Sequence, residues 1–85
     1  MIFLSQITSA TALEFPVKSI CELAKEKGIL TIIDGAHVPG HLDLNINKLD
    51  CDFYTGAGHK WLCAPKGTSF LYVKKEHQSW VRPLV

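Results

Sequence analysis

An excess of charge of either sign is missing from this chain of 85 residues. Nine lysine and arginine side chains are matched by eight acidic ones, which leaves a formal net charge of +1. A protein that binds nucleic acid or an anionic membrane through charge carries a clear basic excess. The composition therefore gives no reason to expect nucleic acid or a membrane as partner. The 47% hydrophobic and 20% charged residues are typical of a globular domain.

Cysteine pairs with metal-ligand or redox spacing are also missing. Cys21, Cys51 and Cys63 are odd in number, and no two of them are separated by only two residues. This pattern argues against a disulfide framework and a zinc site, so we interpret all three as reduced packing residues. His41 and His77 lack a pattern of partner residues, and no metal site is predicted.

Long apolar runs are the third absence. No run approaches the ~20 residues that a membrane-spanning helix needs. The apolar start, Met1–Leu4, is too short for a signal peptide and has no basic residues before it. We therefore predict a cytoplasmic protein.

The first half of the chain alternates between strand-like and helical patterns. Ile2–Leu4 predicts a short strand, and a polar turn follows it. Pro16 begins a predicted helix, because its missing N–H costs nothing at that position. One apolar stripe with helical spacing runs along this helix and consists of Val17, Ile20, Cys21 and Ala24. Gly28 is suited to end the helix in a left-handed turn. The β-branched run Ile29–Ile33 predicts a strand buried on both faces, as in parallel sheets.

The second half predicts two further strands. Residues 42–49 fit either a short helix or an irregular turn. Residues 52–55 predict a strand, which the chain leaves over residues 56–60, and residues 68–73 predict the last strand. The gap between these two strands is too short for a helical crossover, so we expect them to run antiparallel. The predicted fold class is α/β, with a mostly parallel sheet, one antiparallel strand and helical cover.

Asp34 and Lys60 follow directly after two neighbouring predicted strands. Ligands of such sheets bind beyond the carboxyl ends of the parallel strands, and both residues lie at that edge. A lysine and an acid in this arrangement suit pyridoxal phosphate (PLP). The lysine forms an imine with the aldehyde, and the acid keeps the pyridine nitrogen protonated so that the ring accepts electrons.

Each of these residues also has a simpler interpretation. Asp34 and Gly35 form a common turn dipeptide, so the acid can serve only to cap a turn. His37 alone fits a surface or core histidine, and Lys60 alone fits a solvated lysine. The glycine-rich segment 56–60 is an unusual place for a solubilising charge, however, because glycines let a backbone approach a ligand or phosphate closely.

Two motifs carry a resemblance to a known family. Residues 34–40 read DGAHVPG and residues 52–67 read DFYTGAGHKWLCAPKG. They resemble the class V aminotransferases, PLP enzymes of the aspartate aminotransferase fold, and within them the isopenicillin N epimerase-like branch. Residues 5–12, SQITSATA, also resemble that branch. The similarity extends over residues 4–73.

The resemblance assigns a role to each matching position. It implies that Lys60 forms the imine with the cofactor and that Asp34 pairs with its pyridine nitrogen. His37 falls where the family has Gln or His against the phenolic oxygen of the cofactor. His59 matches a histidine near the phosphate, and the same corner would be lined by Thr55 and Gly56.

Two positions depart from the cysteine desulfurase branch of the family. Ala57 stands where that branch carries a phosphate-binding serine. Ser9 stands where it has an asparagine near the ring, and we include Ser9 among the expected cofactor-binding residues. The nucleophilic cysteine of that branch matches none of the three cysteines present.

The resemblance implies a PLP-dependent enzyme that acts on an amino-acid substrate through proton chemistry at Cα, with a homodimer in the full-length relative. Epimerisation, transamination and loss of a β-substituent all use the residues present, so a cysteine desulfurase or other lyase is one alternative. An inactive remnant or interaction module is another. Family members are several times longer. We therefore expect residues 1–85 to be a central fragment of the PLP-binding large domain, without linker or second domain, and inactive in isolation.

Overall fold

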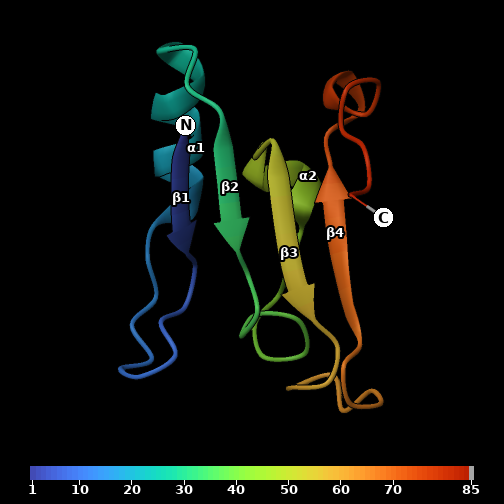
Figure 1. The fold of residues 1–85 in the computed structure, drawn as a ribbon. Coiled ribbons are helices and arrows are strands. Elements are labelled where there is room, and N and C mark those ends of the chain that lie inside the picture. Colours follow the sequence, from blue (N-terminus) through green and yellow to red (C-terminus); the bar gives the residue numbers. More distant parts are fainter. Residues whose placement is uncertain (85) are drawn as a thin grey trace.

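The strands form one sheet in chain order. In the computed structural model, which describes residues 1–84, the order is β1-β2-β3-β4. The strands are β1 (Ile2–Ser5), β2 (Thr31–Asp34), β3 (Phe53–Ala57) and β4 (Ser69–Val73). Figure 1 shows β1, β2 and β3 running in one direction and β4 running back, in agreement with two parallel pairings and one antiparallel pairing. The predicted fold class is confirmed.

Three short helices complete the described structure. The main helix, α1 (Val17–Glu26), connects β1 to β2, and Pro16 occupies the position just before its first turn. Gly28 follows the helix with a φ of 64°, as the sequence predicted. The segment between β2 and β3 contains only the four-residue helix α2 (Ile46–Leu49), and a 3-10 helix, η1 (Lys75–His77), follows β4. Among residues 1–84, no helix combines the length and apolar character needed to cross a membrane.

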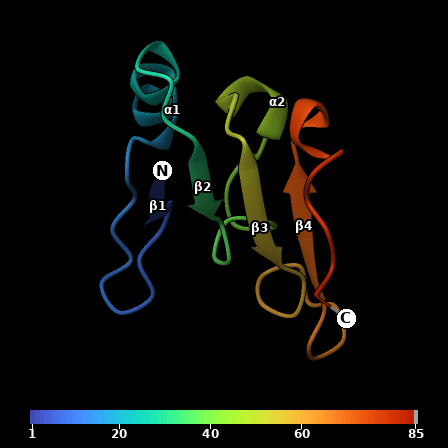
Figure 2. The same ribbon diagram turned by 45° about the horizontal axis from the view of Figure 1, so that its top comes forward.

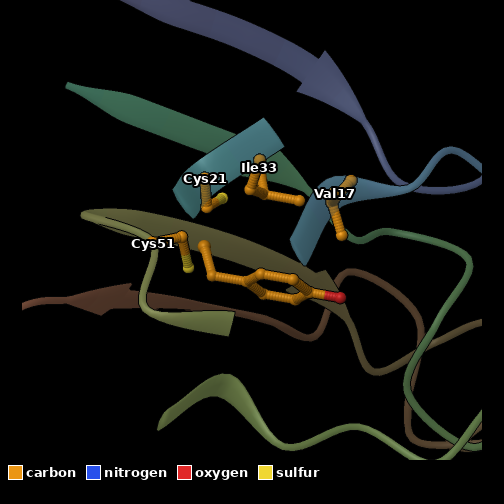
Figure 3. Packing of buried hydrophobic residues seen from close by; sticks show 5 residues of the cluster. Val17, Cys21, Ile33 and Cys51 are labelled. Atoms are coloured by element: carbon orange, nitrogen blue, oxygen red, sulfur yellow. The ribbon is translucent and has the colours of Figure 1, made fainter. Parts of the chain in front are cut away.

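Both α-helices cover the same face of the sheet. Figures 1 and 2 show α1 beside β1 and β2, and α2 beside β3 and β4. The core between helices and sheet is a cluster of fully buried side chains, four of which are labelled in Figure 3. Its members are Val17, Cys21, Ile33, Cys51 and Tyr54. Burial raises the pKa of the Cys21 thiol and raises the pKa of Cys51 to about 12, so both behave as inert packing groups.

The opposite face of the sheet is largely open in the described residues. Phe3 is 67% exposed and Leu71 is 57% exposed. The prediction that β2 is buried on both faces is therefore wrong for this structure: Thr31 and Ile33 are buried, whereas Ile32 is only half-buried. The residue pattern of β2 is apolar on both sides, but the described helices cover one side only.

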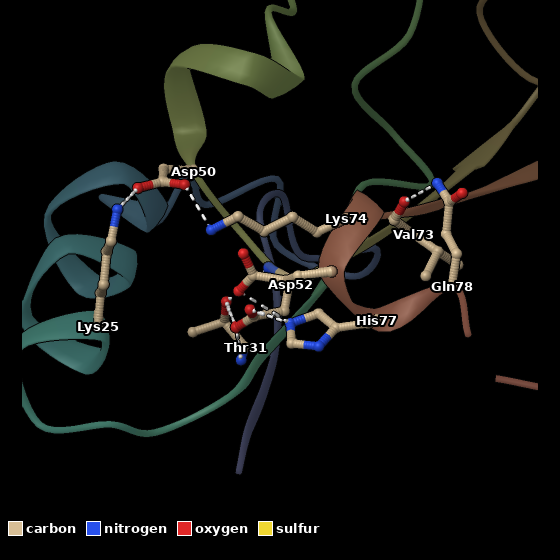
Figure 4. Close-up of polar contacts among 9 residues, drawn as sticks. Lys25, Thr31, Asp50, Asp52, Val73, Lys74, His77 and Gln78 are labelled. Atoms are coloured by element: carbon tan, nitrogen blue, oxygen red, sulfur yellow. Dashed lines mark hydrogen bonds and ion pairs between the residues drawn. The ribbon is translucent and has the colours of Figure 1, made fainter. Parts of the chain in front are cut away.

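A polar network holds the amino ends of β2 and β3 together (Figure 4). The backbone amide and hydroxyl of Thr31 donate to Oδ2 of Asp52 at 2.8 and 3.1 Å, and Nε2 of His77 lies 2.7 Å from its Oδ1. Burial alone would raise the pKa of Asp52, but the hydrogen bonds from His77 and Thr31 outweigh it and hold that pKa below its usual value. These bonds tie the segment after β4 to the sheet.

Asp50 forms a second part of the same network. Its carboxylate pairs with Lys25 of α1 and with Lys74, the latter at 2.8 Å. The hydrogen bonds from Lys25 and then Lys74 lower the pKa of Asp50, and the bond to Asp50 raises the pKa of Lys74. Asp50 itself has a φ of 53°, in the left-handed region where Asp is tolerated among non-glycine residues.

The structure corrects three details of the sequence interpretation. β2 begins at Thr31, because the amide of Ile29 still bonds to the carbonyl of Ala24 at the end of α1. Gly56 belongs to β3, where it pairs with β4, and not to the exit loop. Cys63 is exposed in the loop after β3, so only two of the three cysteines pack in the core.

Candidate active site

Three loops meet at the carboxyl edge of the parallel strands. They follow β1, β2 and β3 and comprise residues 6–15, 35–45 and 58–68 (Figure 1). Asp34 ends β2 and lies opposite Thr55 of β3 in the strand register. The amide of Gln6 donates to the carbonyl of Asp34 at 2.9 Å, which fixes the first loop to the second strand. Ligands of parallel sheets bind at this edge.

The turn after Asp34 is held tightly in place. The amide of Gly35 donates to the carbonyl of Thr55 at 2.9 Å, and the amide of Ala36 donates to Oδ1 of Asp34 at 3.0 Å. Asp34 therefore caps this turn through Oδ1, whether or not it has a further role. Oδ2 has no hydrogen-bond donor within residues 1–84, which leaves this oxygen available to a further donor such as a protonated ring nitrogen.

Position 35 requires a glycine because the side chain of Tyr54 approaches its backbone closely. A Cβ atom built on residue 35 would lie 2.0 Å from the hydroxyl oxygen of Tyr54. That hydroxyl donates to Oε1 of Gln6 at 2.9 Å, and both side chains are buried. Burial raises the pKa of Tyr54 and so keeps the phenol protonated as a donor. The turn that carries Asp34 thus lies directly on a buried, hydrogen-bonded pair.

Lys60 and His37 are brought together from different loops. Nζ of Lys60 lies 3.2 Å from Nε2 of His37, although 23 positions separate them in sequence. Nε1 of Trp61 lies 3.4 Å from Nδ1 of the same ring. These three residues line an open cavity of about 330 Å³, inside the range of about 300 to 1,000 Å³ that small-molecule sites occupy. The lysine is half-buried, so its amine stays accessible from this cavity.

His59 is oriented by the strand that returns from the site. Its Nδ1 lies 2.9 Å from the carbonyl oxygen of Thr68, so Nδ1 carries the proton and donates. Nε2 is then the nitrogen left for a ligand, and the ring is exposed. Only the protonated ring can donate from both nitrogens at once, which is the form that suits a phosphate.

Three further residues were expected to bind the cofactor, namely Thr55, Gly56 and Ser9. Thr55 is half-buried and, by strand alternation, shares the open face of the sheet with Asp34. At Gly56 a Cβ atom would lie 2.3 Å from the ring of Phe70, so packing explains this glycine. Ser9 lies in the exposed turn of the first loop. A cofactor contact by any of these residues remains a prediction.

Sequence reasoning missed the residues that support the site. Trp61 contacts His37, and Gln6 with Tyr54 supports the Asp34 turn. The only sequence signal for Trp61 is a large aromatic residue directly after the candidate lysine. Nothing in the sequence links Gln6 to Tyr54, because the pair spans 48 positions.

A second polar cluster lies at the opposite, amino edge of the sheet. Potential ligand atoms of Asp52, Glu76 and His77 lie within 4.8 Å of one another, although the sequence predicted no metal site. The hydrogen bonds of Asp52 to Thr31 and His77 already account for this arrangement as a structural network. The adjacent cavity, of about 180 Å³, is smaller than the cavity at Lys60 and is lined by no site residue predicted from the sequence.

The fold matches that of a solved enzyme. The apo structure of a cysteine desulfurase from Thermococcus onnurineus NA1 superimposes with a TM-score of 0.84, at 29% sequence identity. The match covers 88% of this chain and 19% of that one. The four-stranded sheet of this chain is therefore part of an α/β fold shared with that cysteine desulfurase.

The chain belongs to the class V aminotransferase family, whose model matches residues 1–85. The isopenicillin N epimerase of Streptomyces clavuligerus is 49% identical over 73 residues, or 86% of this chain and 18% of the relative. That of Amycolatopsis lactamdurans is 43% identical over 83 residues, or 98% of this chain and 21% of the relative. The chain thus spans about a fifth of the length of these curated relatives.

Proposed function

We propose that this chain forms part of a PLP-dependent enzyme that performs proton chemistry at Cα of amino acids, of the isopenicillin N epimerase type. The observation that carries the proposal is the position of Lys60. Its amine opens into the cavity of about 330 Å³, 3.2 Å from His37, at the sheet edge where ligands of this fold class bind. The identity of 49% to an isopenicillin N epimerase supports the epimerase type.

The residues present fit the cofactor in their chemistry. Lys60 would hold the aldehyde carbon, and the free Oδ2 of Asp34 would accept a hydrogen bond from the protonated pyridine nitrogen. His37 would face the phenolic oxygen, while His59 and Thr55 would lie toward the phosphate. When bound, PLP supplies an electron-accepting ring that makes the Cα proton of an attached amino acid acidic.

Lys60 and Asp34 have separate roles in the transfer of the Cα proton. The free amine of Lys60 would act as the general base that takes the proton from Cα. The Asp34 carboxylate would lie beside the ring nitrogen, and the Ala36 amide fixes its orientation through Oδ1. The packing of Gly35 on Tyr54 prevents this turn from shifting. Return of a proton to the other face of Cα gives the epimer.

Chemical trapping tests the role of Lys60. The full-length protein is incubated with PLP, reduced with sodium borohydride and mapped by peptide mass spectrometry. We expect one labelled lysine, Lys60, and loss of the label in Lys60→Ala. Lys66→Ala is the matched control, since Lys66 is exposed in the same loop, and it should keep the label. A label on Lys66, or spread over several lysines, would show that the assignment is wrong.

A lyase of the cysteine desulfurase type is the second candidate, and the TM-score of 0.84 to such an enzyme favours it. The two reactions differ in what leaves the substrate. An epimerase exchanges the Cα proton with deuterium from solvent and keeps the side chain intact, whereas a desulfurase releases sulfur from cysteine. We expect deuterium exchange without sulfur release. Sulfur release from cysteine as the main reaction would favour the lyase.

A further inference from the structure

The ring of His37 lies between two nitrogen groups of the next loop. Nε1 of Trp61 approaches Nδ1 at 3.4 Å, and Nζ of Lys60 approaches Nε2 at 3.2 Å. Both ring nitrogens are therefore engaged by consecutive residues. Which imidazole nitrogen of His37 carries the proton decides whether Nζ of Lys60 must donate or accept the hydrogen bond between them.

The indole of Trp61 decides that assignment. An indole N–H can only donate a hydrogen bond, so Nδ1 of His37 must accept it. A neutral imidazole has one donor and one acceptor nitrogen, so Nε2 then carries the proton. That proton points to Nζ of Lys60, which accepts it through a lone pair only as a free amine. A proton on Nδ1 would instead place two N–H groups against each other.

Trp61 is itself held by the loop that carries His37. Its indole lies on the ring of His41, with centroids 4.7 Å apart and planes tilted by 34°. Nδ1 of His41 donates to the carbonyl of His37 at 3.1 Å. At Gly40, with a φ of 79°, a Cβ atom would lie 2.7 Å from the carbonyl oxygen of Trp61. These contacts hold the loop of residues 35–45 and the loop of residues 58–68 together at His37 and Trp61.

We propose that Trp61 is a positioning residue that holds His37 in the tautomer with the proton on Nε2, so that His37 presents this proton to the amine of Lys60. A hydrogen bond into the lone pair favours the free amine over the ammonium form, and the free amine attacks an aldehyde once this hydrogen bond is released. The link to imine formation rests on the function proposed above, whereas the tautomer follows from the contacts of residues 37, 60 and 61 alone.

The tautomer can be measured without any cofactor. Nitrogen-15 labelling of histidine in the full-length protein, with two-bond nitrogen–proton correlation spectra, reports which imidazole nitrogen carries the proton. His37→Gln identifies the signals of residue 37. We expect the wild-type protein to have the Nε2–H form of His37. A proton on Nδ1 in the wild-type protein overturns the proposal without recourse to any variant.

Two aromatic substitutions then separate the N–H group from packing. Trp61→Phe keeps a ring on His41 but removes the donor. Trp80→Phe is the matched control, because Trp80 is 55% exposed against 52% for Trp61 and packs at the other edge against His77. We expect Trp61→Phe to shift the tautomer ratio of His37 by roughly two- to tenfold, the range of one net hydrogen bond. No shift, or an equal shift in Trp80→Phe, overturns the proposal.

The link to Lys60 has its own measurement. The rate of borohydride-trapped labelling of Lys60 by PLP should fall by roughly two- to tenfold in Trp61→Phe, for the same reason, and stay unchanged in Trp80→Phe. Equal rates in the two variants overturn the link to the amine. If PLP does not label Lys60 in the wild-type protein, the proposed function is wrong, and the cofactor-free spectra still decide the role of Trp61.

Discussion

Gly35 lies directly against the hydroxyl group of Tyr54, and a methyl group at position 35 would stand 2.0 Å from that oxygen. The contact couples the turn that carries Asp34 to the core of the sheet, because Tyr54 is fully buried and bonded to Gln6. Gly35 is therefore required by packing against Tyr54, and not only by the turn that it forms with Asp34. This relationship makes the geometry of Asp34 sensitive to a single added carbon atom.

Gly35→Ala should destabilise the protein strongly. Overpacking and the loss of the buried Tyr54–Gln6 bond together should cost about 3 kcal/mol or more. Gly28→Ala is the matched control, because a Cβ atom there meets nothing within 4 Å and pays only the strain of a φ of 64°, about 1 kcal/mol. Urea unfolding of both variants checks the difference. Equal midpoints would contradict the described packing.

Asp34→Asn should remove function and leave the fold intact. An amide oxygen can still accept the bond from Ala36, so the urea midpoint should stay close to that of the wild type. The lost charge should slow turnover by on the order of 10²- to 10³-fold, the cost of removing one electrostatic group from a site. Asp43→Asn, at an exposed position of the same loop, should leave turnover unchanged. A fully active Asp34→Asn enzyme would refute the role of the carboxylate.

His37 should tolerate glutamine better than leucine. Glutamine offers an acceptor to Trp61 and a donor toward Lys60 or the cofactor, whereas leucine offers neither. We expect PLP to dissociate roughly two- to tenfold faster from His37→Leu than from His37→Gln, the effect of one lost hydrogen bond. The decay of the visible absorption band on dilution gives both rates. Identical rates would mean that His37 does not contact the cofactor.

The carboxylates of Asp50 and Asp52 should make the fold sensitive to acid. Their pKa values in the folded protein lie below the ordinary 3.8, owing to hydrogen bonds from Lys25 and Lys74 to Asp50, and from His77 and Thr31 to Asp52. A lowered pKa stabilises the fold above the unfolded value, and this contribution is lost as the pH falls through the folded value. The free energy of unfolding should therefore fall steeply only below about pH 4.

Asp52→Asn tests this linkage. The variant should be less stable than the wild type at neutral pH and should lose less stability between pH 4 and pH 2, because one linked carboxylate is gone. Asp43→Asn, whose residue lies exposed in a loop, should keep the wild-type acid profile. An unchanged acid slope in Asp52→Asn would show that the Thr31 and His77 bonds do not hold this carboxylate ionised.

The sequence predicted the sheet well because its signals are local. The helical stripe of α1, the left-handed Gly28 and the short gap before β4 all lie within a few positions of the feature that they predict. The errors came from distant partners. Gly56 joins β3 only because Phe70 of β4 pairs with it, and the face of β2 that stays open depends on which segments cover the sheet.

In the candidate site, too, residues with a local sequence signal were predicted and residues with distant partners were missed. Asp34 and Lys60 stand out in the sequence because each lies at or just beyond the end of a strand, which is a local property. Trp61 could not be assigned a contact, because its partner His37 lies 24 positions away and meets it only after two loops have folded together. The exposure of Cys63 was missed for a similar reason, since an apolar residue type says little about a loop position.

The chain-order arrangement of the sheet also has a consequence for how the structure assembles. Each strand pairs with the strand synthesised just before it, so contacts stay close in sequence and the sheet can grow in the direction of translation. The loop of Lys60 depends on the segment that is made last. The amide of Gly58 and the ring of His59 both bond to the carbonyl of Thr68 at the start of the last hairpin arm. Lys60 should therefore acquire its final position only after β4 has been made, among the last events in the folding of this sheet.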